Sequence, residues 1–313
     1  MPSPILTFDF ASDFSEGLAA VRIGDRYAYI DRAGREVITV DSSFDGASSF
    51  SEQRALVRVN DVFGYLDRSG QVIIPPQFPG ANAFSNGLAA VRTGNGYGYI
   101  DLAGKMVIAP KFTLTSDFSE GIAAVKQDDR YGYIDPQGNW AIALQYEDAW
   151  SFSESRAVVR VQGQWCYIDR TGTVVIPSAF DGAFSFSGGL GRIRRGTTWG
   201  FVDPTGALAI PPQFDFASDF AEERAAVLVG SQWGYIDPQG KMAIAPQYSF
   251  AANFSGGRAA ITVKGKIGFI DPAGKVAIAP QFTQAGSFSE GYAWVQLENS
   301  RHFIDPTGKF LQR

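Results

Sequence analysis

A unit of 34 residues is repeated nine times along this chain of 313 residues, and the repeat constrains the fold more than any single residue does. Each unit is anchored by a phenylalanine, followed 17 residues later by an aspartate and 20 residues later by a glycine. The anchors are Phe14, Phe50, Phe84, Phe118, Phe152, Phe186, Phe220, Phe254 and Phe288. The first step is 36 residues, because two residues are inserted between Gly34 and Phe44, and every later step is 34. We therefore expect a single domain over residues 1–313.

The third unit shows the strands that each repeat predicts. Two β-prone runs, 88–92 and 97–100, flank Gly94-Asn95 and predict a hairpin with a type I′ or II′ turn. A second turn, Asp-x-x-Gly, begins at Asp101, and a third strand should run from there to a proline that ends its pairing. Residues 112–118 form either a short fourth strand or a connection. The apolar residues show no helical periodicity, so we expect essentially no helix.

Antiparallel sheets repeated nine times favour an all-β, closed, nine-bladed β-propeller. An eight-bladed ring with one unit extruded, a distorted nine-bladed ring and an open β-solenoid are the alternatives. Solenoids need atypical polar units at both ends, whereas the first and last units here keep their anchors. Placing Arg313 before Leu6 would complete a ninth unit in register, which predicts a ring closed by joining the two termini.

Composition limits the classes of function. The net charge is −5, and the sequence contains no block of like charges. Both observations argue against a nucleic-acid partner. The single cysteine, Cys166, excludes an intramolecular disulfide and a multi-cysteine metal site. No apolar run is long enough to span a membrane, and residues 1–10 show no signal-peptide pattern. We expect a cytoplasmic monomer that binds no membrane, no metal and no cofactor.

The sequence Trp-Gly, followed by an aromatic residue and then Val-Asp or Ile-Asp, occurs at Trp199-Gly200 and Trp233-Gly234. Related pairs stand at the same place in other units, namely Phe63-Gly64, Tyr97-Gly98, Tyr131-Gly132, Trp165-Cys166 and Ile267-Gly268. In this pattern the chain resembles the bacterial WG-repeat family over about its full length. The resemblance implies a propeller-like β-repeat protein with no common catalytic residue.

The repeated polar residues fit structural roles better than a catalytic or metal-binding role. Nine aspartates could be mistaken for a metal-binding array, but one carboxylate per 34 residues is too sparse for shared ligation. We expect these aspartates to cap turns, and the Ser-Glu-Gly after most anchor phenylalanines to do the same.

Departures from the repeat point to candidate binding residues in the last unit. The column that holds Gly64, Gly98, Gly132, Gly200, Gly234 and Gly268 holds Ala28, Cys166 and His302 in the other three units. Cys166 fits a small buried filler. His302, with Arg301 beside it and Trp294 at a position that is usually alanine, indicates either a loosened last blade or a ligand pocket in which Trp294 stacks.

A second group of candidates, Arg192, Arg194 and Arg195, lies in the sixth unit, where Arg192 takes a position that is usually apolar or small, on the same strand face as Arg194. A neighbouring column is basic in the first six units: Arg22, Arg58, Arg92, Lys126, Arg160 and Arg194. These side chains either pair with acids of neighbouring blades, or form a basic arc that binds an anionic group.

The predicted function is a non-catalytic binding or scaffolding module that recognises a protein or another polymer on one propeller face. Short loops between the strands leave flat faces, which suit macromolecular contact better than enclosed chemistry. A small-ligand protein for a sugar or an anionic metabolite is the first alternative. A hydrolase with unidentified acidic residues is the second.

Overall fold

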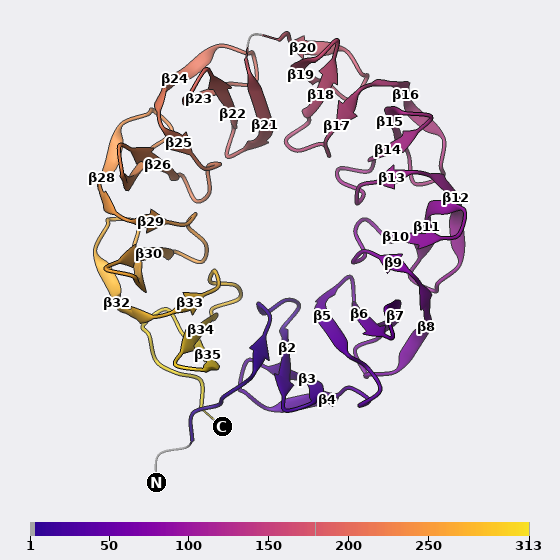
Figure 1. Ribbon diagram of the computed structural model, residues 1–313, viewed down its shortest axis with the longest axis vertical. Coiled ribbons are helices and arrows are strands. Elements are labelled where there is room, and N and C mark those ends of the chain that lie inside the picture. Colours follow the sequence, from indigo (N-terminus) through magenta and orange to yellow (C-terminus); the bar gives the residue numbers. More distant parts are fainter. Residues whose placement is uncertain (1–3, 179, 313) are drawn as a thin grey trace. The chain divides into compact units, whose positions relative to one another are not determined.

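A computed structural model describes residues 4–178 and 180–312 as an all-β protein. Within these residues there are 35 strands, β1–β35, and no helix, so none could cross a membrane. The strands form nine antiparallel sheets that follow one another along the chain, one per repeat, and Figure 1 shows them as successive groups. The fold class is that of a nine-bladed β-propeller, as the repeat predicts.

The first four sheets each have four strands. Sheet 1 contains β1 (Phe10–Ala11), β2 (Leu18–Ile23), β3 (Arg26–Asp31) and β4 (Glu36–Thr39). Sheet 2 contains β5 (Gly46–Ser51), β6 (Arg54–Val59), β7 (Val62–Leu66) and β8 (Val72–Phe78). Sheet 3 contains β9 (Gly80–Ala81), β10 (Leu88–Thr93), β11 (Gly96–Asp101) and β12 (Met106–Phe112). Sheet 4 contains β13 (Leu114–Thr115), β14 (Ala123–Gln127), β15 (Arg130–Ile134) and β16 (Trp140–Tyr146).

The other five sheets repeat this order. Sheet 5 contains β17 (Asp148–Ala149), β18 (Ala157–Val161), β19 (Gln164–Ile168) and β20 (Val174–Ile176). Sheet 6 contains β21 (Gly182–Ser187), β22 (Leu190–Arg195), β23 (Thr198–Val202) and β24 (Leu208–Phe214). Sheet 7 contains β25 (Phe216–Ala217), β26 (Ala225–Val229), β27 (Gln232–Ile236) and β28 (Met242–Tyr248). Sheet 8 contains β29 (Phe250–Ala251), β30 (Ala259–Val263), β31 (Lys266–Ile270) and β32 (Val276–Phe282), and sheet 9 contains β33 (Gln284–Ala285), β34 (Ala293–Leu297) and β35 (Ser300–Ile304).

The chain divides into two compact units, which we describe separately. Unit 1 consists of Met1–Gln77, Ser231–Gly234 and Ala243–Arg313. Unit 2 consists of Phe78–Gly230 and Tyr235–Met242. The region between the fourth strand of one sheet and the second strand of the next contains a short strand, such as β13. Of the two alternatives for residues 112–118, the structure therefore shows the strand.

The turns between second and third strands have two residues, as predicted, but Gly94-Asn95 of sheet 3 is not of type I′ or II′, because the positive φ of 111° falls on Gly96 after the turn. Asn60 and Asp61 have φ of 48° and 61°, and Asp128 and Asp129 have φ of 49° and 63°. Positive φ at both central residues defines the type I′ turn, whose twist matches that of the flanking strands. We call the end of the sheets that carries these turns the hairpin end.

The Asp-x-x-Gly turns lie at the opposite end of the third strands, and the aspartates cap them as predicted. In each of the nine turns the carboxylate accepts the N–H groups two and four residues later. In four turns a hydroxyl group also donates to the carboxylate, from Ser69, Thr171, Thr205 and Thr307. Ser69 lowers the pKa of Asp67, Thr171 that of Asp169 and Thr205 that of Asp203.

These caps predict a loss of stability in acid. Because the pKa values of Asp67, Asp169 and Asp203 are lower in the folded protein than in the unfolded chain, their contribution is present above the unfolded pKa of about 4. It is lost as the pH falls through the folded pKa. The free energy of unfolding, measured by urea titration between pH 6 and pH 2.5, should therefore decrease below about pH 4.

A hydroxyl-free variant isolates one cap. Thr205→Val should weaken the acid dependence, since Asp203 then lacks one of its donors. Thr197→Val, in the hairpin turn of the same sheet, is the matched control. Equal pH profiles for the two variants would show that the Thr205 hydroxyl does not stabilise the carboxylate.

The fourth strands correct one expectation from the sequence. The proline does not end the strand; β12 continues through Pro110 to Phe112 by way of a bulge. Tyr99 pairs with Ile108 while Tyr97 pairs with Phe112, so three residues oppose Gly98 alone. A Cβ at Gly98 would lie 2.8 Å from the Pro110 nitrogen and would collide with the Ile108 carbonyl oxygen. The glycine column therefore exists because the bulge crowds it.

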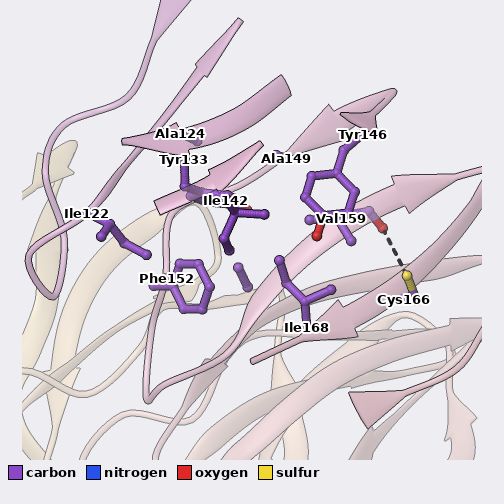
Figure 2. Packing of buried hydrophobic residues seen from close by; sticks show 11 residues of the cluster. Ile122, Ala124, Tyr133, Ile142, Tyr146, Ala149, Phe152, Val159, Cys166 and Ile168 are labelled. Atoms are coloured by element: carbon purple, nitrogen blue, oxygen red, sulfur yellow. Dashed lines mark hydrogen bonds between the residues drawn. The ribbon is translucent and has the colours of Figure 1, made fainter. Parts of the chain in front are cut away.

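The three exceptions to that column fall in the sheets in which no such bulge lies opposite it, and in sheet 9 the described residues form no fourth strand. Ala28 pairs regularly with Thr39, where the two inserted residues follow β4. Opposite Cys166, β20 has already ended at Ile176. Cys166 is buried, and burial raises the pKa of its thiol, which fits an unreactive filler. Figure 2 shows its sulfur facing the Val159 carbonyl oxygen, 3.8 Å away.

Neighbouring sheets are joined by the anchor phenylalanine and the Ser-Glu pair after it. All nine anchor phenylalanines are buried, and each is at most 2% exposed. The Ser153 hydroxyl donates to the Phe186 carbonyl of the next sheet at 2.8 Å, and Glu154 accepts the Gly189 N–H at 2.9 Å. The turn-capping role expected for these two side chains is thus corrected, because they link sheets instead.

The same links join the last sheet to the first within unit 1. Ser289 donates to the Phe14 carbonyl oxygen at 2.7 Å, and Glu290 accepts the Gly17 N–H at 2.8 Å. Residues near both chain ends also complete the edge of sheet 9, since Phe8 exchanges two backbone hydrogen bonds with Arg301. Arg313 lies outside the described residues, and closure of the complete set of sheets stays a prediction.

Candidate functional site

The basic column predicted from the sequence lies at the hairpin end, where each basic side chain faces an aromatic residue across the strand pair. In unit 2 the pairs are Arg92–Tyr97, Lys126–Tyr131, Arg160–Trp165 and Arg194–Trp199. The Lys126 ammonium lies 5.7 Å from the Tyr131 ring centroid, and the Arg160 guanidinium 5.8 Å from that of Trp165. A cation over an aromatic ring is a favourable pairing even at an exposed position.

The acids that partner this column come from the same sheet. Pairing with acids of a neighbouring blade, which was one of the two alternatives for this column, is not what these ion pairs show. Arg58 pairs with Asp45 at 2.7 Å, and Arg160 with Glu147 at 3.8 Å. The same carboxylates accept hairpin-turn N–H groups, as Glu147 does from Gly163 at 2.9 Å. In sheet 3 this acidic position is Pro79, and Arg92 forms no ion pair with any residue that the structure describes.

Arg192 is held inside a set of contacts between sheets 6 and 7. Its Nε donates to Asp219 Oδ1 at 2.8 Å and its Nη1 to the Ala217 carbonyl oxygen at 2.7 Å. The guanidinium also lies 4.2 Å from the ring centroid of Phe184 and 5.0 Å from that of Trp199. Its side chain is 13% exposed. These contacts give Arg192 a structural role, since an anion would have to displace Asp219 to reach it.

The last candidate residues reproduce this arrangement with two side chains exchanged. Trp294 stands three repeats after Arg192, and Arg301 stands three repeats after Trp199. The Arg301 guanidinium lies 4.2 Å from the Trp294 ring centroid, and its Nη1 donates to the Ala11 carbonyl oxygen at 3.1 Å. The Trp294 ring that was expected to stack on a ligand therefore stacks on Arg301.

His302 joins the two chain ends. It is buried, its Nδ1 lies 3.0 Å from the Leu6 carbonyl oxygen, and its ring packs edge-on against Phe310. Between the two expectations for this column, these contacts favour a side chain that fills the seam over one that lines a ligand pocket.

Arg194 and Arg195 are exposed and lie beside a cleft that the sequence did not indicate. Arg194 Nη2 donates to the Asp181 carbonyl oxygen at 3.4 Å, and the Arg195 guanidinium lies 5.2 Å from the Phe180 ring centroid. Arg192, Arg194 and Arg195 belong to unit 2, and Trp294, Arg301 and His302 to unit 1. The two groups are therefore separate candidates.

The cleft has a volume of about 480 Å³ and lies between sheets 5 and 6. It is lined by Arg160, Gln164, Trp165, Ser178, Phe180 and Asp181. The sequence signal beside it is small: Pro177 stands at the same repeat position as Pro211 of segment 208–214, and the next residue is Ser178 where that segment has Pro212.

Nine antiparallel sheets with repeated links between them define a propeller-type repeat protein. The chain belongs to the family of WG-containing repeat proteins. The family model matches nine segments: residues 6–27, 27–62, 63–97, 97–131, 131–165, 166–196, 199–232, 233–266 and 267–300. A search of curated proteins finds no match.

Solved structures show similarity of fold at low sequence identity. A crystal structure titled as the eukaryotic initiation factor is 10% identical, with a TM-score of 0.68 and 95% of each chain covered. The dihydro-heme d1 dehydrogenase NirN is 14% identical, with a TM-score of 0.50 over 81% of this chain and 71% of that one. At these identities the likeness concerns the fold alone.

Proposed function

We propose that this protein is a non-catalytic binding or scaffolding module that recognises a protein or another polymer at the hairpin end of its sheets. The observation that carries the proposal is the pairing of one basic with one aromatic side chain in each of the four successive sheets 3–6 of unit 2. A partner with a repeating or extended surface can contact such pairs one after another. Each pair adds a small contribution that is summed over the sheets.

The repeated residues support a non-catalytic role, because they are engaged in holding the fold. The aspartates cap turns, and the serine and glutamate side chains bond to the next sheet. The cleft beside Trp165 favours a second candidate function, binding of a small ligand. Cytoplasmic location, a monomeric state and a lack of nucleic-acid or membrane partners remain predictions.

Charge reversal at the hairpin end tests the proposal. In affinity capture from a lysate of the source cell, the double variant Arg92→Glu, Lys126→Glu should capture at least tenfold less of the partner than the unchanged protein does. The two positions are then negatively charged and repel the groups that the positive charges recognise. Lys105→Glu, Lys241→Glu changes the net charge equally near the Asp-x-x-Gly turns and is the control. Equal capture by both variants would place the binding surface elsewhere.

A further inference from the structure

The sheet that carries Trp165 departs from the repeat beside the cleft between sheets 5 and 6. The fourth strand β20 has three residues, whereas β16 and β24 in the flanking sheets have seven. The bulge that crowds the third strand elsewhere is missing, so Cys166 stands in the glycine column. The half-buried Trp165 ring beside it borders open space of about 480 Å³.

The wall opposite Trp165 is held in place by the two arginines that the sequence singled out. Arg195 lies over the ring of Phe180, and Arg194 donates to the Asp181 carbonyl oxygen. The Asp181 carboxylate accepts the Gly196 N–H through Oδ2 at 2.6 Å, which fixes its direction. One oxygen of this carboxylate, Oδ1, forms no hydrogen bond with any residue that the structure describes.

The polar groups of the cleft combine donors and acceptors. Arg160 can only donate, the ionised Asp181 can only accept, and Gln164 and Ser178 can do both. A hydroxyl group both donates and accepts, so a ligand with several hydroxyl groups can satisfy this set. A phosphate or another compact anion fits less well, because the Asp181 carboxylate would repel it.

Aromatic packing around Trp165 favours a ligand with one apolar face. The Trp165 and Trp150 rings meet edge to face at 6.1 Å, and Trp150 meets Phe184 in the same way at 5.6 Å. These neighbours hold the indole in one orientation. A pyranose ring has an apolar face of C–H groups and a polar rim of hydroxyl groups, which is the combination that an aromatic wall with mixed polar groups selects.

We propose that this cleft binds a pyranose unit of an oligosaccharide or polysaccharide, which stacks on Trp165 and donates hydroxyl hydrogen bonds to Asp181. Gln164 and Arg160 contact the remaining hydroxyl groups. The proposal deepens the proposed function and rests on it, since it names a polysaccharide as the polymer.

The equivalent cleft between sheets 3 and 4 provides an internal comparison. Its volume is about 450 Å³, and Tyr97, Gly96 and Thr113 stand in place of Trp165, Gln164 and Asp181. It lacks the carboxylate and the side-chain amide, so the structure assigns saccharide binding to the cleft beside Trp165 and not to this one.

Titration of the purified full-length chain with a panel of neutral oligosaccharides (cello-, chito-, malto- and xylo-oligosaccharides), followed by calorimetry, tests the proposal. At least one series should bind, and Trp165→Ala and Asp181→Asn should each weaken that binding at least tenfold. Gln164→Ala changes an exposed residue, so it tests the cleft even where Trp165→Ala fails to fold.

Two control variants separate loss of contact from loss of structure. Asp215 accepts the Gly230 N–H at 2.6 Å as Asp181 accepts that of Gly196, so Asp215→Asn removes a turn cap outside the cleft. Trp140→Ala removes an exposed tryptophan that lines neither cleft. Neither should alter the affinity. Absence of binding by the whole panel, or binding that survives all three cleft variants, would overturn the saccharide site.

Failure of this site and failure of the proposed function give different results. If no saccharide binds but the Arg92→Glu, Lys126→Glu variant still loses a captured partner, the result supports the proposed binding module and contradicts the pyranose site. If saccharide binding is lost in the cleft variants and capture is insensitive to charge reversal, the result supports the saccharide site in the cleft and contradicts the proposed hairpin-end surface.

Discussion

Gly98→Ala should destabilise the protein by about 2 kcal/mol, within the range that overpacking of a well-packed interior costs. The added methyl group would meet the Pro110 nitrogen at 2.8 Å and the Pro110 Cα at 3.0 Å, as well as the Ile108 carbonyl oxygen. These are backbone atoms of the bulged strand β12, which cannot rotate away as a side chain would. Urea unfolding at pH 7 measures the effect.

A second glycine in the same hairpin provides the control. Gly94→Ala places its methyl group where no atom lies within 4 Å, so its effect should stay within about 0.5 kcal/mol. If the two substitutions cost the same, the bulge does not restrict the glycine column. Only a larger loss of stability for Gly98→Ala than for Gly94→Ala would show that crowding by the fourth strand restricts the column to glycine.

Exchanging Arg192 and Trp199 is expected to restore much of the stability that each single substitution removes. Arg192→Trp alone should cost about 2 kcal/mol or more, since Asp219 and the Ala217 carbonyl oxygen lose their donor. Trp199→Arg alone places a second guanidinium beside the first. The double variant Arg192→Trp, Trp199→Arg reproduces the order seen at Trp294 and Arg301, where the arginine still reaches the equivalent carbonyl oxygen.

A double-mutant cycle measured by urea unfolding gives the coupling energy between the two positions. We expect a coupling of about 1–3 kcal/mol in favour of the double variant, as found for residues in direct contact. Additive effects would show that the two arrangements, despite their shared geometry, do not stabilise the sheets through the Arg–Trp contact.

Much of the fold could be predicted because the repeat carries its own register. The two-residue hairpin turns and the aspartate caps follow from residue types at fixed spacing, whereas the residues of the short strand before each second strand fitted a strand and a connection equally. The bulge through Pro110 could not, because proline usually ends strand pairing and three residues opposite one leave no periodic signal.

The candidate site was less predictable, for a physical reason. Arg192, Trp294 and Arg301 do stand out in the sequence, but their partners come from the following sheet, as Asp219 and Ala11 do. A single repeat does not show which residues of its neighbour it meets. The cleft beside Trp165 is lined in part by residues that follow the end of β20, and strand ends are the least predictable part of a sequence.

The edge of sheet 9 makes the order of synthesis matter for folding. Phe8 and Leu6 are made early, but the residues that hold them, Arg301 and Leu311, follow about 290 residues later. Until then the N-terminal segment has no partner strand and β35 has an open edge, which is the kind of edge that pairs with another chain. The contacts between the two ends cover an edge that could otherwise pair with another copy, so their loss is expected to favour aggregation.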